Sequence, residues 1–165
     1  MTVTVDAPTL CFELSEDHKM VRDMVKKLAD EEIAPRAAHY DETREFPWEN
    51  TKKLAELGLM GITVPEEYGG AGMDTLAYVL VIEELSRACA ATGVIAAVQN
   101  SLATTPLLSF GSEDLKKKYL PQLASGDKIG AYALTEPGSG SDAASIQTTC
   151  REEGDHWVLN GQKTW

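Results

Sequence analysis

The chain has 165 residues, 43% of them hydrophobic and 25% charged, enough for one domain with a core or for one domain and part of another. Its net charge of −11 argues against nucleic acid and anionic membrane surfaces as partners. The three cysteines and three histidines lack metal-ligand or disulfide spacing, and no apolar run approaches a membrane span. From the cysteine and histidine spacing we expect no bound metal. The first twelve residues also lack the basic and apolar blocks of a signal peptide, so we expect a reducing cytoplasm.

The first third of the chain predicts two helices. Ser15 is a suitable N-cap for the first, and Pro35 predicts its end or a kink. The apolar stripe of this helix consists of Val21, Met24, Val25 and Leu28. Residues 36–45 are polar and show no strong pattern. Pro47 fits the first turn of a second helix, which Gly58 ends.

The middle of the chain predicts further helices after a short extended piece at residues 61–65. A third helix runs from a cap at Asp74 to about residue 88, and is apolar on more than one side. Its apolar residues at helical spacing are Leu76, Val79, Leu80 and Leu85. A fourth, almost uncharged helix covers residues 93–102, and a short apolar segment follows it at 106–110. Ser112 then caps a helix over residues 113–123.

The character of the sequence changes after residue 126. Residues 129–135 and 144–151 read as strands, and 156–159 as a third between two turn signals. Residues 164–165 begin a further strand. So few strands leave open sheet edges, so we expect the chain to be the N-terminal part of a longer α+β protein.

A glycine-serine loop follows the first predicted strand, and residues 132–142 read Tyr-Ala-Leu-Thr-Glu-Pro-Gly-Ser-Gly-Ser-Asp. Glycines let a backbone approach a ligand closely, and successive N–H groups with small hydroxyls can bind an anion. The loop is therefore a candidate ligand site, although most such loops are only turns. We expect Glu136 and Asp142 to cap this loop by accepting backbone N–H bonds.

Three other nucleotide or catalytic motifs fit this loop poorly. Residues 138–143 satisfy G-x-G-x-x-A, but no helix follows to hold a pyrophosphate, which excludes a Rossmann fingerprint. No Lys-Ser or Lys-Thr pair follows the glycines, which excludes a P-loop. A hydrolase with Ser139 or Ser141 as nucleophile and His156 as base would lack the usual G-x-S-x-G turn.

Several motifs, in order, resemble the acyl-CoA dehydrogenase family over nearly the whole chain. Besides the loop they are Leu57-Gly-Leu-Met-Gly, Pro65-Glu-Glu-Tyr-Gly-Gly-Ala-Gly, Val81-Ile-Glu-Glu-Leu, Tyr119-Leu-Pro-Gln-Leu and Gly154-Asp-His-Trp-Val-Leu-Asn-Gly-Gln-Lys-Thr-Trp165. The resemblance implies an N-terminal all-α domain at residues 1–126 and the first strands of a middle β-barrel-like domain at 127–165. The family's C-terminal helical bundle has no counterpart here.

The resemblance also implies an activity. These flavoenzymes use FAD to oxidise the Cα–Cβ bond of an acyl-CoA to a trans-2-enoyl-CoA in fatty acid β-oxidation. Electrons usually pass to an electron-transfer flavoprotein, and the enzymes are commonly homotetramers. Residues 93–102 look most similar to short-chain members.

Carried over by motif, the resemblance assigns residues to a cofactor and a substrate. The cofactor-binding residues that it implies are Tyr132, Leu134, Thr135, Gly140, Ser141 and Trp165. Ser141 also matches a position near the CoA part of the substrate, and Ile95 and Leu102 match the acyl cavity. Without the family match, plain core packing would explain most of these side chains equally well.

No carboxylate in this chain matches the family's catalytic glutamate, so the resemblance assigns no catalytic residue here. We therefore expect the chain alone to be inactive. Two alternatives remain open at this point, a related acyl-CoA oxidase-type flavoenzyme and a non-catalytic acyl-CoA-binding protein.

Overall fold

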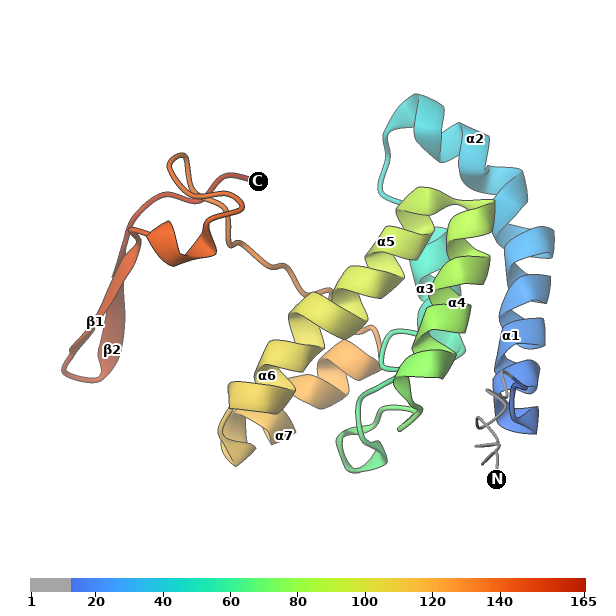
Figure 1. Ribbon diagram of the computed structural model, residues 1–165, viewed down its shortest axis with the longest axis horizontal. Helices are drawn as coiled ribbons and strands as arrows, with labels where there is room; N and C mark the ends of the chain where they lie inside the picture. Colours follow the sequence, from blue (N-terminus) through green and yellow to red (C-terminus); the bar gives the residue numbers. More distant parts are fainter. Residues whose placement is uncertain (1–12) are drawn as a thin grey trace, which may run out of the picture. The chain divides into compact units, whose positions relative to one another are not determined.

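A computed structural model describes residues 13–165, which form two compact units (Figure 1). The helical unit ends at Gly130, and the β-containing unit covers Ala131–Trp165. Helices in the first unit and an antiparallel strand pair in the second confirm the predicted α+β fold. None of the helices over residues 13–165 combines the length and apolar character needed to cross a bilayer.

The first helix, α1, spans Glu16–Leu28 and begins as predicted, because the hydroxyl of Ser15 accepts a hydrogen bond from the His18 N–H at 3.2 Å. It does not end near Pro35. A π-helical turn at Ala29–Ile33 leads directly into α2, Ala34–Thr43, which runs at an angle to α1 (Figure 1). The proline lies in the first turn of α2, where a missing N–H costs little. The expected kink is confirmed, whereas residues 36–43 are helical although their sequence shows no strong pattern.

Helix α3 spans Trp48–Glu56, and Gly58 follows it with a left-handed φ of +71°. The next segment, residues 61–65, is a series of turns that leads into a 3₁₀ turn at Glu66–Tyr68, so the expected extended piece is wrong. Backbone carbonyls of this segment bond to residues about ten positions further along the chain. The carbonyls of Gly61 and Ile62 accept hydrogen bonds from residues 71 and 73, at 2.9 Å each.

Helix α4 spans Thr75–Ala88, with Asp74 as the predicted cap. It buries Ala77, Val81 and Leu85, whereas Leu76 and Val79 are exposed. The buried face of the helix therefore differs from the predicted apolar stripe, and the two share only Leu85. Because α4 is apolar on nearly every side, spacing alone could not select the buried face.

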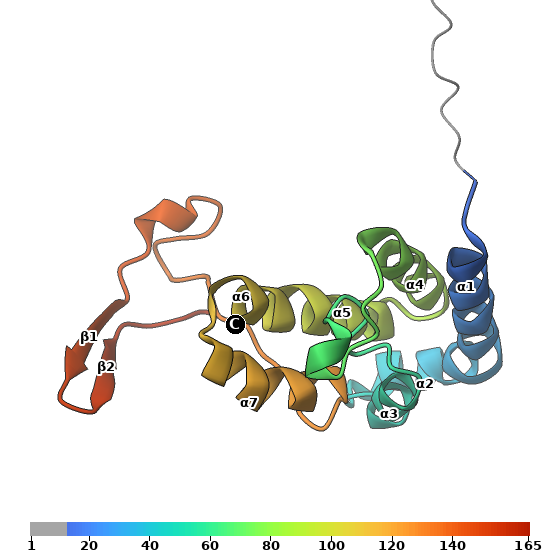
Figure 2. The ribbon, with the colours of Figure 1, turned by 90° about the horizontal axis from the view of Figure 1, so that it is seen from below.

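Helix α5, Ala90–Val98, passes through a π-helical turn at Gln99–Ala103 into α6, Thr104–Phe110, as one continuous rod (Figure 1). The expected fourth helix therefore begins three residues earlier and includes the segment predicted as separate. Helix α7, Glu113–Ala124, is capped by Ser112 as predicted and packs beside α6 (Figure 2).

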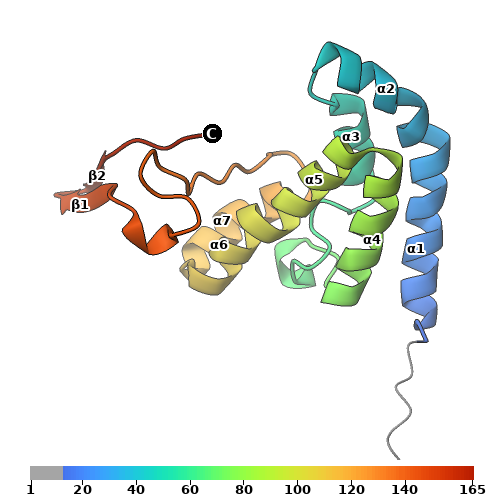
Figure 3. The same ribbon diagram turned by 45° about the horizontal axis from the view of Figure 1, so that its top comes forward.

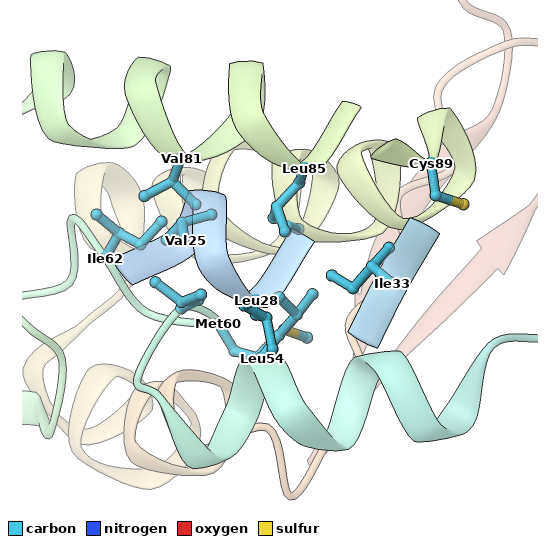
Figure 4. Packing of buried hydrophobic residues seen from close by; sticks show 11 residues of the cluster. Val25, Leu28, Ile33, Leu54, Met60, Ile62, Val81, Leu85 and Cys89 are labelled. Atoms are coloured by element: carbon cyan, nitrogen blue, oxygen red, sulfur yellow. The ribbon is translucent and has the colours of Figure 1, made fainter. Parts of the chain in front are cut away.

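The main core lies where α1, α3, α4 and α5 meet, and Figure 3 shows α4 between α1 and α5. Figure 4 shows side chains of α1, α3 and α4 converging with Met60 and Ile62 from the loop after α3. The fully buried members of this core are Val25, Ile33, Leu54, Met60, Val81, Leu85 and Ala96. A smaller cluster of Val64, Tyr68, Leu120 and Ala124 lies beside α7. The main cluster includes Ala96 of α5, and Ile95 of the same helix packs against it.

The β-containing unit holds one hairpin. Strand β1, Thr149–Glu153, pairs with β2, His156–Asn160, and Gly154 occupies the turn with a φ of +66°. The expected strand at 129–135 is extended but belongs to no sheet of the described residues. In the second expected strand, residues 143–145 form a 3₁₀ turn and pairing starts only at Thr149. Residues 164–165 form no strand, although the Thr164 N–H donates to the Thr135 carbonyl at 2.8 Å.

Two buried amides of the π turn bind backbone groups of other segments. Gln99 donates to the carbonyls of Leu123 and Lys128 at 2.8 and 3.0 Å and accepts from the Gly130 N–H at 2.8 Å. Asn100 accepts from the Ile62 N–H at 2.7 Å and donates to two carbonyls at 2.9 Å each. The π turn is thus the point at which loop 59–62 and residues 123–130 are attached to α5.

Replacing Asn100 by alanine should destabilise the helical unit by about 2–3 kcal/mol, because the buried Ile62 N–H loses its acceptor. Urea unfolding followed by the helical circular dichroism signal measures the loss. Ser101→Ala is the matched control, since Ser101 is half-buried and bonds only to Ala97 in its own helix. It should cost less than about 0.5 kcal/mol; equal losses for both variants would contradict this role of Asn100.

Candidate functional site

The glycine-serine loop closes on itself at its start. The Glu136 N–H donates to the Ser139 carbonyl at 2.9 Å, and the Ser139 N–H donates to the Glu136 carbonyl at 3.1 Å. The buried Ser139 hydroxyl donates to the Asp142 carbonyl at 2.8 Å. These bonds fix a tight turn over residues 136–139 and leave the next residues, Gly140 and Ser141, exposed.

The carboxylate of Glu136 holds three segments of the β-containing unit together. Only 7% of this residue is exposed. Its Oε2 accepts the Gln147 N–H at 2.7 Å, while Oε1 accepts the Thr148 N–H at 3.0 Å and the Lys163 ammonium at 2.9 Å. The prediction that Glu136 accepts backbone N–H bonds is confirmed.

These donors stabilise the charged form of Glu136. Hydrogen bonds from Thr148, from the N–H of Gln147 and from the ammonium of Lys163, in that order, lower the pKa of Glu136 from 4.5 to about 2, against the opposing effect of burial. The carboxylate is therefore ionised at neutral pH. Asp142 behaves differently from expectation, because its carboxylate accepts the Ser145 hydroxyl and only its backbone carbonyl accepts an N–H, also from Ser145.

Lys163 and Thr164 join the end of the chain to the segment before the loop. The Lys163 ammonium also donates to the Leu134 carbonyl at 3.0 Å, and the Thr164 N–H donates to the Thr135 carbonyl. Consecutive residues of one segment thus hold consecutive carbonyls of the other. This places residues 132–135 and Trp165 in one connected structure.

The structure brings the six predicted cofactor-binding residues into this same unit, on segments that Glu136 and Lys163 link. Tyr132 and Leu134 expose their side chains, and Trp165 follows Thr164 in the segment that bonds to Thr135. Within the described residues, no hydrogen bond reaches the backbone of residues 131–133. An extended segment with free N–H and C=O groups and exposed apolar side chains offers both kinds of contact that a planar polar ring needs.

Two glycines of the loop have no structural reason inside the described chain to lack a side chain. A Cβ added to Gly138 or Gly140 would meet no atom within 4 Å, and neither residue has a left-handed φ. Gly161 differs, because its Cβ would lie 2.1 Å from the Thr148 hydroxyl. Internal packing therefore explains Gly161, whereas the space over Gly138 and Gly140 is open to a ligand.

The predicted acyl-cavity residues lie in the helical unit. Ile95 on α5 is half-buried and packs against the main core, and Leu102 in the π turn is exposed. Ser141, predicted to contact both ligands, is exposed after the tight turn. Residues 13–165 contain no cluster of three or more His, Cys, Asp or Glu side chains that could hold a metal ion.

Sequence reasoning missed the role of Lys163 and the burial of Ser139. Lys163 lies 27 residues from Glu136, and only the closure of the β1–β2 hairpin brings it back to the loop. The turn signal at Gly154-Asp155 predicts that closure, but not which side chain meets the carboxylate. Ser139 gives no signal, because a serine in such a loop is ordinarily exposed.

Family models match almost all of the chain. The acyl-CoA dehydrogenase N-terminal domain matches residues 15–127, and the acyl-CoA dehydrogenase middle domain matches residues 131–165. The chain belongs to the acyl-CoA dehydrogenase family. The family resemblance that the sequence motifs predict is thereby confirmed.

Proteins with similar sequences and structures carry names from the same family. The mitochondrial short-chain specific acyl-CoA dehydrogenase of Mus musculus is 52% identical over 93% of this chain and 37% of its own length. An acyl-CoA dehydrogenase complexed with FAD from Bacillus anthracis has a TM-score of 0.84 and 43% identity, covering 93% of this chain and 26% of that one.

A structure from work on the electron transferring flavoprotein of Acidaminococcus fermentans has a TM-score of 0.89 and 42% identity. It covers 93% of this chain and 40% of that one. The chain spans 37–40% of the length of the curated relatives that it matches.

The Glu136 carboxyl should titrate near pH 2 instead of the roughly 4.3 of an ordinary glutamate. Because the pKa is lower in the folded state, the carboxylate's contribution to stability is complete above pH 4.5 and is lost as the pH falls toward 2. NMR of carboxyl-labelled glutamate measures the midpoint directly. Unfolding of Glu136→Gln should lack this acid dependence, while Glu153→Gln on the exposed hairpin should keep it. A Glu136 midpoint at or above 4 would contradict the bonded geometry.

Proposed function

We propose that this chain supplies part of the FAD and acyl-CoA site of an acyl-CoA dehydrogenase. The observation that carries the proposal is the open space over Gly138 and Gly140, which neither backbone conformation nor packing explains. A glycine without an internal reason suits a loop that a ligand approaches at backbone distance. Exposed Tyr132 and Leu134 in the same unit suit the faces and edges of a flavin ring.

The residues present fit FAD in chemical type. The free backbone groups of residues 131–133 and the Thr135 hydroxyl can bond to the polar edge of the ring, and apolar side chains can cover its face. The N–H groups and hydroxyl at Gly140 and Ser141 suit an anionic phosphate. The similar protein from Bacillus anthracis holds FAD, which supports the same cofactor here.

When bound, FAD would accept the hydrogen of the acyl Cβ as a hydride while a base removes the Cα proton, leaving a trans-2-enoyl thioester. This chain's residues bind and orient in that reaction. Glu136 is unsuited to be the base, because its pKa of about 2 makes it a weak proton acceptor and three donors already occupy it. Ser141 would contact the CoA part of the substrate, and Ile95 and Leu102 would line the acyl cavity.

The substrate and partners follow from the relatives. Short acyl-CoA thioesters are the proposed substrates, because the mouse relative is named as short-chain specific. An electron-transfer flavoprotein is the proposed electron acceptor, supported by the similar structure from Acidaminococcus fermentans. A role in β-oxidation and a homotetramer complete the proposal on the basis of the family resemblance. A cytoplasmic location is proposed because the three scattered cysteines form no disulfide framework, which suits a reducing compartment.

Gly140→Ala tests the cofactor site without disturbing the fold. The added methyl group meets nothing in the chain, so stability should stay equal or rise by about 0.4–1 kcal/mol. FAD binding, measured by quenching of flavin fluorescence, should weaken about tenfold, because the methyl group occupies the space that the cofactor approaches.

The matched control is Glu152→Ala on β1, whose side chain is exposed and which the family motif does not place at the cofactor. It should change the FAD dissociation constant less than about threefold, roughly 0.65 kcal/mol. Unchanged FAD binding by Gly140→Ala, or a wild-type chain that binds no FAD, would refute the proposed site.

A further inference from the structure

The ion pair between Lys163 and Glu136 differs from the surface pairs of this chain. Surface pairs such as Lys19–Glu16 link neighbouring residues of one helix and contribute little to stability. Lys163 instead bridges 27 residues to a carboxylate that is almost fully buried. Its own ammonium is only partly exposed, and its second bond goes to the backbone carbonyl of Leu134.

This ammonium lies between the two segments that carry the proposed flavin contacts. One segment contains Tyr132, Leu134 and Thr135, and the other ends at Trp165. Lys163 binds the Leu134 carbonyl, and Thr164 binds the next carbonyl along, that of Thr135. No other hydrogen bond in the described residues joins these two segments. The spacing of Trp165 from residues 132–135 therefore depends on this pair of bonds.

Glu136 fixes the position of the ammonium in turn. Its two oxygens are held by the N–H groups of Gln147 and Thr148, which immediately precede β1. The carboxylate is thus attached to the hairpin and cannot follow Lys163 if the end of the chain moves. Lys163 is held against a fixed charge, which makes its position reproducible before any ligand binds.

We propose that Lys163, held by Glu136, is a positioning residue for the cofactor that sets the distance between the Tyr132–Thr135 segment and Trp165. This inference rests on the proposed function. A site whose two walls are already in place loses less freedom on binding, so it binds its cofactor more tightly than one that must order them. Lys163 acts through the backbone that it holds and needs no contact with the cofactor itself.

The test compares Lys163→Met with three matched variants of the whole chain, and the probe is FAD. Lys163→Met keeps the linear stem and removes the ammonium. Lys163→Arg keeps the charge, and Arg151→Met removes a charge from the exposed hairpin, where Arg151 pairs only with Glu153. Gly154→Ala strains the hairpin turn at a φ of +66° but changes none of the bonds that Lys163 makes. It therefore shows how much a general loss of stability alone affects FAD binding.

We expect Lys163→Met to weaken FAD binding about tenfold and to change the visible circular dichroism of the bound flavin. Exchange of the Thr164 amide hydrogen, measured without FAD, should become about tenfold faster. Lys163→Arg should restore affinity to within about threefold. Arg151→Met and Gly154→Ala should leave the affinity of the folded protein within about twofold, although Gly154→Ala lowers the unfolding temperature.

Three results would overturn the positioning role. The first is an unchanged FAD affinity in Lys163→Met, even with faster Thr164 exchange. The second is a loss of FAD affinity in Gly154→Ala equal to that in Lys163→Met. The third is unfolding of the β-containing unit in Lys163→Met. Each of the three results would mean that Lys163 has a structural role alone. A wild-type chain that binds no FAD overturns the proposed function itself, and it is distinguished from these results because the wild type is measured first.

Discussion

The buried carboxylate of Glu136 is the interaction on which the β-containing unit depends. A short hairpin and a glycine-rich loop bury little apolar surface, so hydrogen bonds must hold this unit in one conformation. Glu136 accepts two backbone N–H groups and an ammonium, which bring the loop, the strand entry and the end of the chain to one point. Removing one donor would leave a buried charge under-compensated, so these contacts are interdependent.

In the helical unit, side-chain amides instead of a carboxylate hold separate segments together. Gln99 and Asn100 lie in the π turn and use their amide groups on backbone groups of other segments, apart from one Asn100 donor that bonds to Ala96 in α5. Such bulges inside helices occur frequently at functional sites. Here the turn carries Leu102, a proposed acyl-cavity residue, and it fixes the start of the segment that leads to the proposed flavin contacts.

Local chemistry in the sequence predicts the helix starts and the hairpin turn well. Ser15, Asp74 and Ser112 cap helices as expected, and Gly154 takes the left-handed conformation that the turn needs. The two π turns give no such signal, and the second bonds through Gln99 and Asn100 to backbone groups far along the chain. Residues 129–135 show a strand pattern and are extended, yet pairing needs a neighbouring strand that the described residues do not provide.

The candidate site divides in the same way. The loop motif and the family resemblance identify Tyr132, Leu134, Thr135, Gly140, Ser141 and Trp165 as residues to examine. Neither identifies the ion pair that connects them, because the meeting of Lys163 and Glu136 is a property of the folded hairpin. The sequence alone proposes the contact residues, and the structure adds the ion pair that holds their segments together.

The most direct measurement of the account is an NMR titration of the isotopically labelled chain with FAD, which locates the ligand without reference to activity. We predict that the amide signals of Tyr132, Thr135, Gly140, Ser141 and Trp165 shift together and saturate with one dissociation constant, while those of α1 to α3 stay fixed. Shifts confined to the helical unit, or no shifts at FAD concentrations that saturate related flavoproteins, would contradict it.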